Sequence, residues 1–287
     1  MKKTLIALMA LTGVAMGSTS DYSVTLDSTF YRNPADTGGA WVHLWTGNGS
    51  DDNVKTAANW DVFKATTSTV ADASSNSPSD SDPLFIGYTF SYVNGAQIMT
   101  ANNEAIEVIF NKNVYNTNQF DWSNPRIYLG KNVTFTFDSA NNALKNRTVG
   151  FNFGNFDGTS LIAINCDDSS KPHFWFESSA TMRFSGSIEM SKADYSYTLV
   201  SIDKLSQNAG TWDASGVTVK DAYGNALKYT TDAEKIGQAG YYGVKVEINE
   251  TTNAATVKLI AKAIPEPTTA TLSLLALAGL AARRRRK

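Results

Sequence analysis

The sequence predicts an all-β protein. Its central part is expected to form a β-solenoid, a parallel β-helix-like stack of short strands, and its C-terminal part to form antiparallel hairpins. From residue 84 to residue 203, short runs of alternating apolar and polar residues are separated by turn residues, a pattern typical of β-strands. β-Branched and aromatic residues dominate these runs, which favours strands over helices. Two approximate internal echoes indicate stacked coils.

The two echoes are the basis for expecting a solenoid. Residues 110–114 are similar to residues 129–133, and residues 133–137 are similar to residues 180–184. The intervals approximate one and two turns of a coil of ~20 residues, as in stacked repeat proteins. A β-sandwich of antiparallel hairpins has equally short strands and similar turns, so the sandwich stays open as the alternative fold.

Residues 1–17 have the plan of a secretory signal peptide. Lys2 and Lys3 precede an apolar stretch that ends in small residues, and this order of regions is the one that the secretion machinery recognises. We expect signal peptidase to cleave between Gly17 and Ser18, so that the mature chain is exported.

Three tryptophans frame a Gly/Asp/Asn-rich loop that follows a first strand expected at residues 22–26. Trp41 and Trp45 precede the loop, and Trp60 follows it. The spacing resembles the segment that leads into the repeat domains of autotransporter-like surface proteins. We expect Trp45 and Trp60 to stack and to cap the open end of the core. The alternative is that Trp41, Trp45 and Trp60 form an aromatic platform for a sugar ring.

A series of short strands is expected after a Ser/Asp/Asn/Pro-rich surface loop at residues 71–82. In one of the clearest strands, Phe135 and Phe137 share one face and threonines share the other, which is the period of two of a half-buried strand. The expected strands are residues 106–110, 126–129, 133–137, 149–153, 161–164, 174–176, 182–190 and 197–202.

Two hairpins are expected in the C-terminal part of the chain. In the first, residues 217–220 pair with residues 226–230 across a turn. In the second, residues 241–249 pair with residues 254–261, and Val244, Val246 and Ile248 share one face of the pair. A short helix is considered at residues 232–236.

Composition limits the partners of the protein. Cys166 is the only cysteine, so no internal disulfide can form and the core must supply the stability of an exported chain. Its apolar neighbours indicate a buried small hydrophobe rather than a nucleophile. The whole chain has 27 acidic and 25 basic side chains, and seven of the basic ones lie in its two end segments, at residues 2–3 and 283–287. The part between the ends is therefore acidic and disfavours nucleic acid and other polyanions, but not a neutral glycan.

The C-terminal segment, residues 264–287, has three parts. Pro265-Glu266-Pro267 predicts an exposed, extended hinge, because proline fixes φ and lacks a backbone donor. The apolar run at residues 270–282 would be ~20 Å long as a helix, so it is a marginal transmembrane helix against a hydrocarbon core of ~30 Å. The last part is a basic cluster that is expected to stay on the cytoplasmic side. It consists of Arg283, Arg284, Arg285, Arg286 and Lys287.

Together these three parts resemble the PEP-CTERM sorting signal of proteins exported by Gram-negative bacteria. The resemblance implies transient anchoring in the inner membrane, recognition by an exosortase, which is a membrane transpeptidase, and removal of the tail. It further implies delivery to the outer membrane surface or to the extracellular exopolysaccharide matrix. The chain is then divided into a signal peptide (1–17), an exported β-rich domain (18–263) and a sorting signal (264–287). An ordinary C-terminal membrane anchor is the alternative.

Candidate residues for catalysis are few. His43 and His173 are the only histidines, and no His-Glu-x-x-His, Gly-x-Ser-x-Gly or Cys-x-x-Cys spacing occurs, so no catalytic, cofactor or metal site is expected. A glycosidase-like carboxylate pair and calcium loops at residues 51–53 and 167–168 are weighed against solvated turns, which are preferred. The acidic residues considered for the carboxylate pair are Asp157, Asp167, Asp168, Glu177 and Glu189.

The leading hypothesis is a non-catalytic, structural or adhesive protein of the cell surface or extracellular matrix. Its expected partners are the secretion machinery, signal peptidase, an exosortase-type transpeptidase and a glycan or exopolysaccharide, with no cofactor and no nucleic acid. The second hypothesis is a carbohydrate-binding module that uses exposed tryptophans. The third is a polysaccharide lyase or glycoside hydrolase on a β-helix.

Overall fold

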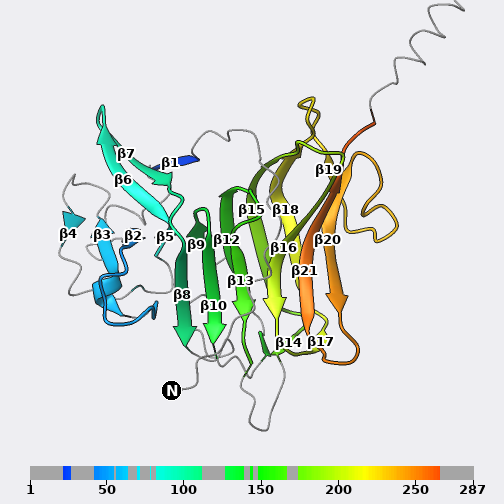
Figure 1. Ribbon diagram of the computed structural model, residues 1–287, viewed down its shortest axis with the longest axis horizontal. Coiled ribbons are helices and arrows are strands. Elements are labelled where there is room, and N and C mark those ends of the chain that lie inside the picture. Colours follow the sequence, from blue (N-terminus) through cyan, green and yellow to red (C-terminus); the bar gives the residue numbers. More distant parts are fainter. Residues whose placement is uncertain are drawn as a thin grey trace, which may run out of the picture.

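The protein is all-β, as expected. Its computed structural model describes residues 22–26, 42–54, 56–63, 70–71, 78, 82–111, 127–138, 143–144, 148–166 and 174–265. Within these ranges the strands form four sheets, and one 3-10 turn, η1 (Ala57–Asn59), lies between β2 (Val42–Trp45) and β3 (Trp60–Phe63). Figure 1 shows the strands of the central part side by side, with a separate hairpin at one end. Among the described residues no helix is long and apolar enough to cross a membrane, and the apolar run at residues 270–282 lies outside them.

The largest sheet has eight strands, and its central neighbours run parallel. Successive strands along the chain take successive places in it, so that each lies beside the one before. The strands in this parallel row are β5 (Leu84–Ile86), β9 (Ile127–Leu129), β12 (Thr148–Asn155), β15 (Thr181–Glu189) and β18 (Thr211–Lys220).

A second sheet of seven strands repeats this arrangement. Its parallel row begins at β8 (Ile106–Asn111) and ends at β16, where the antiparallel β21 and β20 continue the sheet. The remaining strands are β10 (Val133–Asp138), β13 (Leu161–Ile164), β16 (Asp194–Ile202), β19 (Lys228–Tyr229), β20 (Tyr241–Ile248) and β21 (Ala255–Lys262). In Figure 1 this row runs from β8 to β20 across the front of the molecule.

A third, narrow sheet consists of three parallel strands. They are β11 (Ala143–Leu144), β14 (Phe174–Phe176) and β17 (Leu205–Asn208). The chain therefore visits the eight-stranded, seven-stranded and three-stranded sheets in the same order three times, as β9–β10–β11, β12–β13–β14 and β15–β16–β17.

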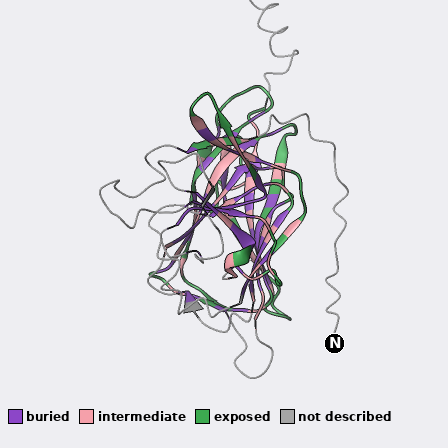
Figure 2. Cartoon of the chain, turned by 90° about the vertical axis from the view of Figure 1, so that its left-hand side faces the viewer, coloured by how far each residue is buried: buried purple, intermediate pink, exposed green. Residues whose placement is uncertain are grey.

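The core consists of rows of apolar side chains that stack across the parallel strands. Phe135 pairs in register with Val108 on one side and with Ile162 on the other, and all three are fully buried. The alternate residue Thr134 is half-buried and lies on the outer face, as the period of two requires. Figure 2 shows buried residues along the strands and exposed ones on the turns. Burial of each such side chain contributes roughly 1.5–3 kcal/mol.

A smaller core lies on the outer side of the eight-stranded sheet at its N-terminal end. Here a three-stranded antiparallel sheet, formed by β1 (Ser23–Leu26), β6 (Tyr88–Val93) and β7 (Ala96–Ala101), packs near the first strands of the large sheet. Those first strands are β2 (Val42–Trp45), β3 (Trp60–Phe63) and β4 (Val70–Ala71). Because apolar residues cover both of its faces, every residue of β2 is buried.

The expected hairpin at residues 241–261 is confirmed, since β20 and β21 pair antiparallel from Tyr242–Ala261 to Ile248–Ala255. The expected hairpin at residues 217–230 forms only at its turn, and the expected pairing of residues 226–230 with residues 217–220 is wrong. The turn forms because the Asp221 carboxylate accepts the backbone N–H groups of Tyr223 and Asn225. Only Lys220 and Ala226 then form an antiparallel bridge, because β19 (Lys228–Tyr229) crosses over and pairs in parallel with β20.

Two further expectations fail. Residues 232–236 form turns rather than a helix, closed by the N–H of Lys235, which donates to the Asp232 carbonyl.

The internal echoes do not mark stacked residues: Phe110 pairs with Phe137 and not with Leu129. The connections between parallel partners differ in length, so residues that stack recur at unequal intervals and leave no fixed period in the sequence.

Candidate functional site

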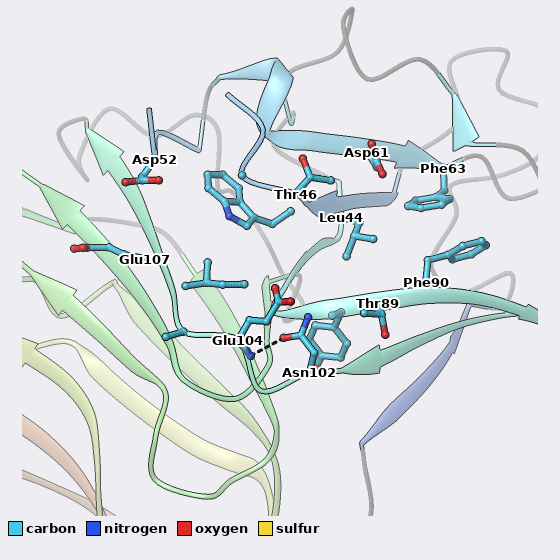
Figure 3. A pocket seen from close by; sticks show the side chains of 15 residues that line it. Leu44, Thr46, Asp52, Asp61, Phe63, Thr89, Phe90, Asn102, Glu104 and Glu107 are labelled. Carbon is cyan, nitrogen blue, oxygen red and sulfur yellow. Dashed lines mark hydrogen bonds between the residues drawn. The ribbon is translucent and has the colours of Figure 1, made fainter. Parts of the chain in front are cut away.

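An open groove lies between the β2–β3 hairpin, strand β6 and the segment that leads from β7 into β8 (Figure 3). Its cavity volume is about 630 Å³, which is within the size range of binding sites for small ligands. Two sheets contribute to it: β2 and β3 belong to the large sheet, whereas β6 belongs to the small antiparallel sheet. The small core beneath these strands holds them together.

The floor of the groove is aromatic and apolar. Trp45, Phe63 and Tyr88 line it and are almost fully buried. Phe90 is half-buried, and its ring lies 4.3 Å from the ring of Phe63 at an angle of 31° between the planes. Phe90 is therefore the aromatic side chain of the lining that is most available to a ligand.

Four carboxylates surround the opening. Figure 3 shows Asp52 and Glu107 on one side, Asp61 on β3 and Glu104 beside Asn102. Asp61 lies between the buried residues of β3, so alternation turns it outward. Glu104 is held by its N–H, which donates to Asn102 Oδ1 at 3.2 Å. The Asp52 carbonyl accepts the N–H of Ile109 at 2.7 Å, which ties the loop of Asp52 to the strand of Glu107.

Among the described residues, the lining carries four acidic side chains and no basic ones, that is, no Lys, Arg or His. None of these four carboxylates takes part in an ion pair within the described part of the chain. Carboxylates elsewhere do: Asp213 lies 3.2 Å from Arg183, and Glu247 lies 2.5 Å from Lys258.

Of the tryptophans considered for a sugar platform, Trp45 lines the groove, and Trp60 packs against Trp45 in the main core. Trp60 is fully buried and Trp45 is 7% exposed, so Trp60 offers no ring face to a sugar and that assignment is wrong. The two rings meet edge to face, 5.0 Å apart, rather than stacked as expected, and they lie within the main core. The Trp60 indole N–H donates to the Val54 carbonyl at 2.9 Å. Trp41 lies outside the described residues.

Asn59, the residue before Trp60, shapes the loop beside the groove. It is fully buried. Its side-chain oxygen accepts the N–H of Gly49 at 2.7 Å, and its side-chain N–H groups donate to the carbonyls of Asp51 and Asn53. The Asp51 carboxylate accepts the N–H of Asn53 and the hydroxyl of Thr56. Residues 51–53 thus form part of a loop that internal hydrogen bonds fix.

Two other tryptophans differ in exposure. Trp175, at the centre of β14, is 47% exposed. Trp212 is almost buried, stacks on Phe176 at 4.1 Å and donates its indole N–H to Asn208 Oδ1 at 2.7 Å. Trp175 is therefore the exposed tryptophan of the described chain, and it stands alone on the narrow sheet.

The described carboxylates among those considered for catalysis lie on turns and at strand ends. Asp157 accepts the N–H of Thr159 at 2.9 Å in the turn between β12 and β13, and Glu189 ends β15. Glu177 follows β14, at the corner that leads back to the large sheet. Within the described ranges no cluster of three or more His, Cys, Asp or Glu side chains is suited to a metal ion. Asp167 and Asp168 lie outside those ranges.

The other candidate side chains have structural surroundings. His43 is fully buried, with its ring edge to face on Trp60 and its Nδ1 3.8 Å from Asp82. His173 lies outside the described residues. Cys166 is half-buried rather than fully buried. Burial raises the pKa of its thiol, which disfavours the reactive thiolate.

The β-domain ends just before the proline motif. The N–H of Ala263 donates to the Ala193 carbonyl at 2.8 Å, and the N–H of Ile264 bonds to the Asp221 carboxylate. Ile264 is 41% exposed, and Pro265 is exposed. The other sorting residues, Glu266, Pro267 and 283–287, and the cleavage site at Gly17 and Ser18 lie outside the described residues.

Comparison with family models, with curated proteins and with solved structures finds no match to this chain.

Most residues that form the groove were not predicted from sequence. Trp45 was singled out for capping or a sugar platform and Asp52 as part of the 51–53 turn, whereas Asp61, Phe90, Glu104 and Glu107 were not. The one usable signal was Asn94-Gly95 between two alternating runs, which is a strong indication of a hairpin and predicts the strand that carries Phe90.

Proposed function

We propose that the domain is a parallel β-solenoid with three faces. The support is the threefold visit to the same three sheets in the same order, together with parallel register between successive strands of each sheet. Stacked coils bury continuous apolar rows, as Val108, Phe135 and Ile162 do. A β-sandwich would instead pair sequential strands as antiparallel hairpins, which in the described part occurs at the two ends.

We propose that the protein is an exported, non-catalytic surface or matrix protein whose C-terminal segment is a sorting signal. The observation that supports this best is the position of Pro265. It is exposed and follows directly on the last hydrogen-bonded residues of the β-domain. An extended segment that is bounded by prolines and lies outside the β-domain can enter the cleft of a processing enzyme. Removal of this segment leaves the core of the domain intact.

The experiment is expression of the full-length chain in a Gram-negative host that has an exosortase. We expect the released protein to begin at Ser18 and to lack Arg283–Lys287 by mass spectrometry. P265A/P267A and E266Q are expected to leave the basic tail attached and the protein in the inner-membrane fraction. Glu250→Gln, on the exposed turn between β20 and β21, is the matched control and should be processed normally. A wild-type protein that keeps its tail and stays in the cytosol would contradict the proposal.

Carbohydrate binding is the second candidate function, and the groove favours it. Phe90 offers a ring face on which the CH face of a sugar can stack. The carboxylates of Asp61 and Glu104 at the rim can accept hydrogen bonds from sugar hydroxyls. Such binding gives the exported domain an adhesive role, with the groove in place of the tryptophan platform.

A further inference from the structure

The charge of the groove restricts the glycans that fit it. Asp52, Asp61, Glu104 and Glu107 carry four like charges around one opening, and the described lining contains no basic residue. Like charges that converge in this way repel each other, and an ionised group that is taken out of water requires a partner. An anionic polysaccharide is disfavoured here, and a neutral one would leave the carboxylates without counter-charges.

The floor of the groove has the opposite character. Phe63 and Phe90 present an apolar surface between the carboxylates. Tyr88, also part of the lining, is 3% exposed, and its hydroxyl is buried and near Tyr22 and Tyr128, which do not line the groove. The groove therefore offers an aromatic face and four carboxylates.

We propose that the groove binds a polymer of amino sugars that carries free, protonated amino groups. Each unit of such a polymer has an apolar CH face that can stack on Phe90, an ammonium group that can pair with a rim carboxylate, and hydroxyls for the remaining acceptors. The proposal rests on the second candidate function, carbohydrate binding, and names its ligand class. It is independent of the sorting of the chain.

The test is isothermal titration calorimetry of the purified full-length chain at about pH 6. The probes are three six-unit oligosaccharides: one of glucosamine, one of N-acetylglucosamine and one of glucose. We expect the glucosamine oligomer to bind at least about tenfold more tightly than the other two, and its affinity to fall as salt screens the charges.

Variants locate the binding. E104Q/E107Q removes two rim charges and is expected to weaken binding of the glucosamine oligomer about tenfold or more, whereas E250Q, a carboxylate outside the groove, should not change it. F90A is expected to weaken binding to a similar extent, whereas Tyr92→Ala, on the same strand and outside the lining, should not. Circular dichroism establishes that each variant is folded.

Four results would overturn the proposal. The glucosamine oligomer does not bind, or E104Q/E107Q binds it as tightly as the wild type. The N-acetylated oligomer binds equally well, which would indicate a neutral glycan. Polylysine binds with equal affinity and with the same dependence on Phe90 and the carboxylates, which would indicate a general polycation site. Because binding is measured on purified protein, none of these results bears on tail removal, and failure of tail removal would not bear on them.

Discussion

The hydroxyl of Tyr242 donates a hydrogen bond to the main-chain carbonyl of Val217. Nearby, the hydroxyl of Tyr229 accepts the N–H of Ala214 at 3.4 Å. Both tyrosines belong to the seven-stranded sheet, and both partners lie on β18, the edge strand of the eight-stranded sheet. Side chains of the seven-stranded sheet thus form hydrogen bonds with backbone groups at the edge of the eight-stranded sheet. An open edge is a template for pairing with another chain, so these bonds help to end the parallel stack.

Tyr242→Phe is expected to lower the free energy of unfolding by about 1–2 kcal/mol, because it leaves the Val217 carbonyl without its donor in a buried position. Urea unfolding followed by circular dichroism measures this change. Tyr92→Phe is the control, since Tyr92 is 54% exposed at the tip of the β6–β7 hairpin and should have no effect. Equal stability of the two variants would show that the hydroxyl of Tyr242 does not stabilise the edge.

Stability is expected to fall above about pH 10, because burial raises the pKa of several tyrosines, among them Tyr88, Tyr197 and Tyr242. The unfolded chain loses these protons near the ordinary tyrosine pKa of ~10, while the native chain keeps them. Above that pH the unfolded state therefore binds fewer protons, and the free energy of unfolding decreases as pH rises. Below it the contribution is fully present.

Urea titrations between pH 8 and pH 11 test this dependence. Tyr88→Phe should flatten the fall, because burial, followed by the nearby Tyr22 and Tyr128, raises the pKa of Tyr88 well above its usual value. Tyr92→Phe should leave the fall unchanged. A fall of equal steepness in the wild type and in Tyr88→Phe would contradict the burial argument for this residue.

The apolar rows should be the most sensitive part of the core. Phe135→Ala removes a fully buried ring that contacts the rings of Phe137 and Phe151, and it is expected to cost about 3–5 kcal/mol. Thr134→Ala, the neighbouring substitution on the outer face, should cost less than about 1 kcal/mol. Urea midpoints compare the two. Similar losses would mean that Phe135 is not part of a tightly packed row.

Local strand structure was predictable because it depends on neighbouring residues. The alternation around Phe135 and Phe137 placed one strand at residues 133–137, and the structure has Val133–Asp138. The strands at residues 161–164 and 174–176 agree fully. Pairing partners were not predictable, because the connections between stacked strands vary in length. The similarity of residues 110–114 to 129–133 therefore carried no information about which strands lie side by side.

The groove was harder to predict than the strands. Asp61 on β3, Phe90 on β6 and Glu107 on β8 are separated by long stretches of chain, and the packing of the small core brings them together. Trp60 was considered for a sugar platform, as the alternative to capping, because of its residue type. Trp60 lies in the core and is fully buried, so it cannot stack on a sugar, and the spacing of residues in the sequence does not predict this burial.

Gly130 links the core to the groove. A Cβ at this position would overlap the carbonyl oxygen of Gly87, and that same oxygen accepts the N–H of Asn102 at 2.8 Å. Asn102 in turn positions Glu104 at the rim. Gly130→Ala must therefore displace backbone rather than a flexible side chain, and the displacement is expected to reach the groove.

Gly130→Ala is expected to cost about 1–3 kcal/mol, as overpacking does, and to weaken binding of the glucosamine oligomer several-fold. Gly95→Ala is the matched control. Gly95 has a φ of +83° with nothing within 4 Å of an added Cβ, so its replacement should cost about 1 kcal/mol through backbone strain alone and leave the affinity unchanged. If Gly130→Ala lowers stability without changing affinity, the groove does not depend on the contact between Gly87 and Asn102.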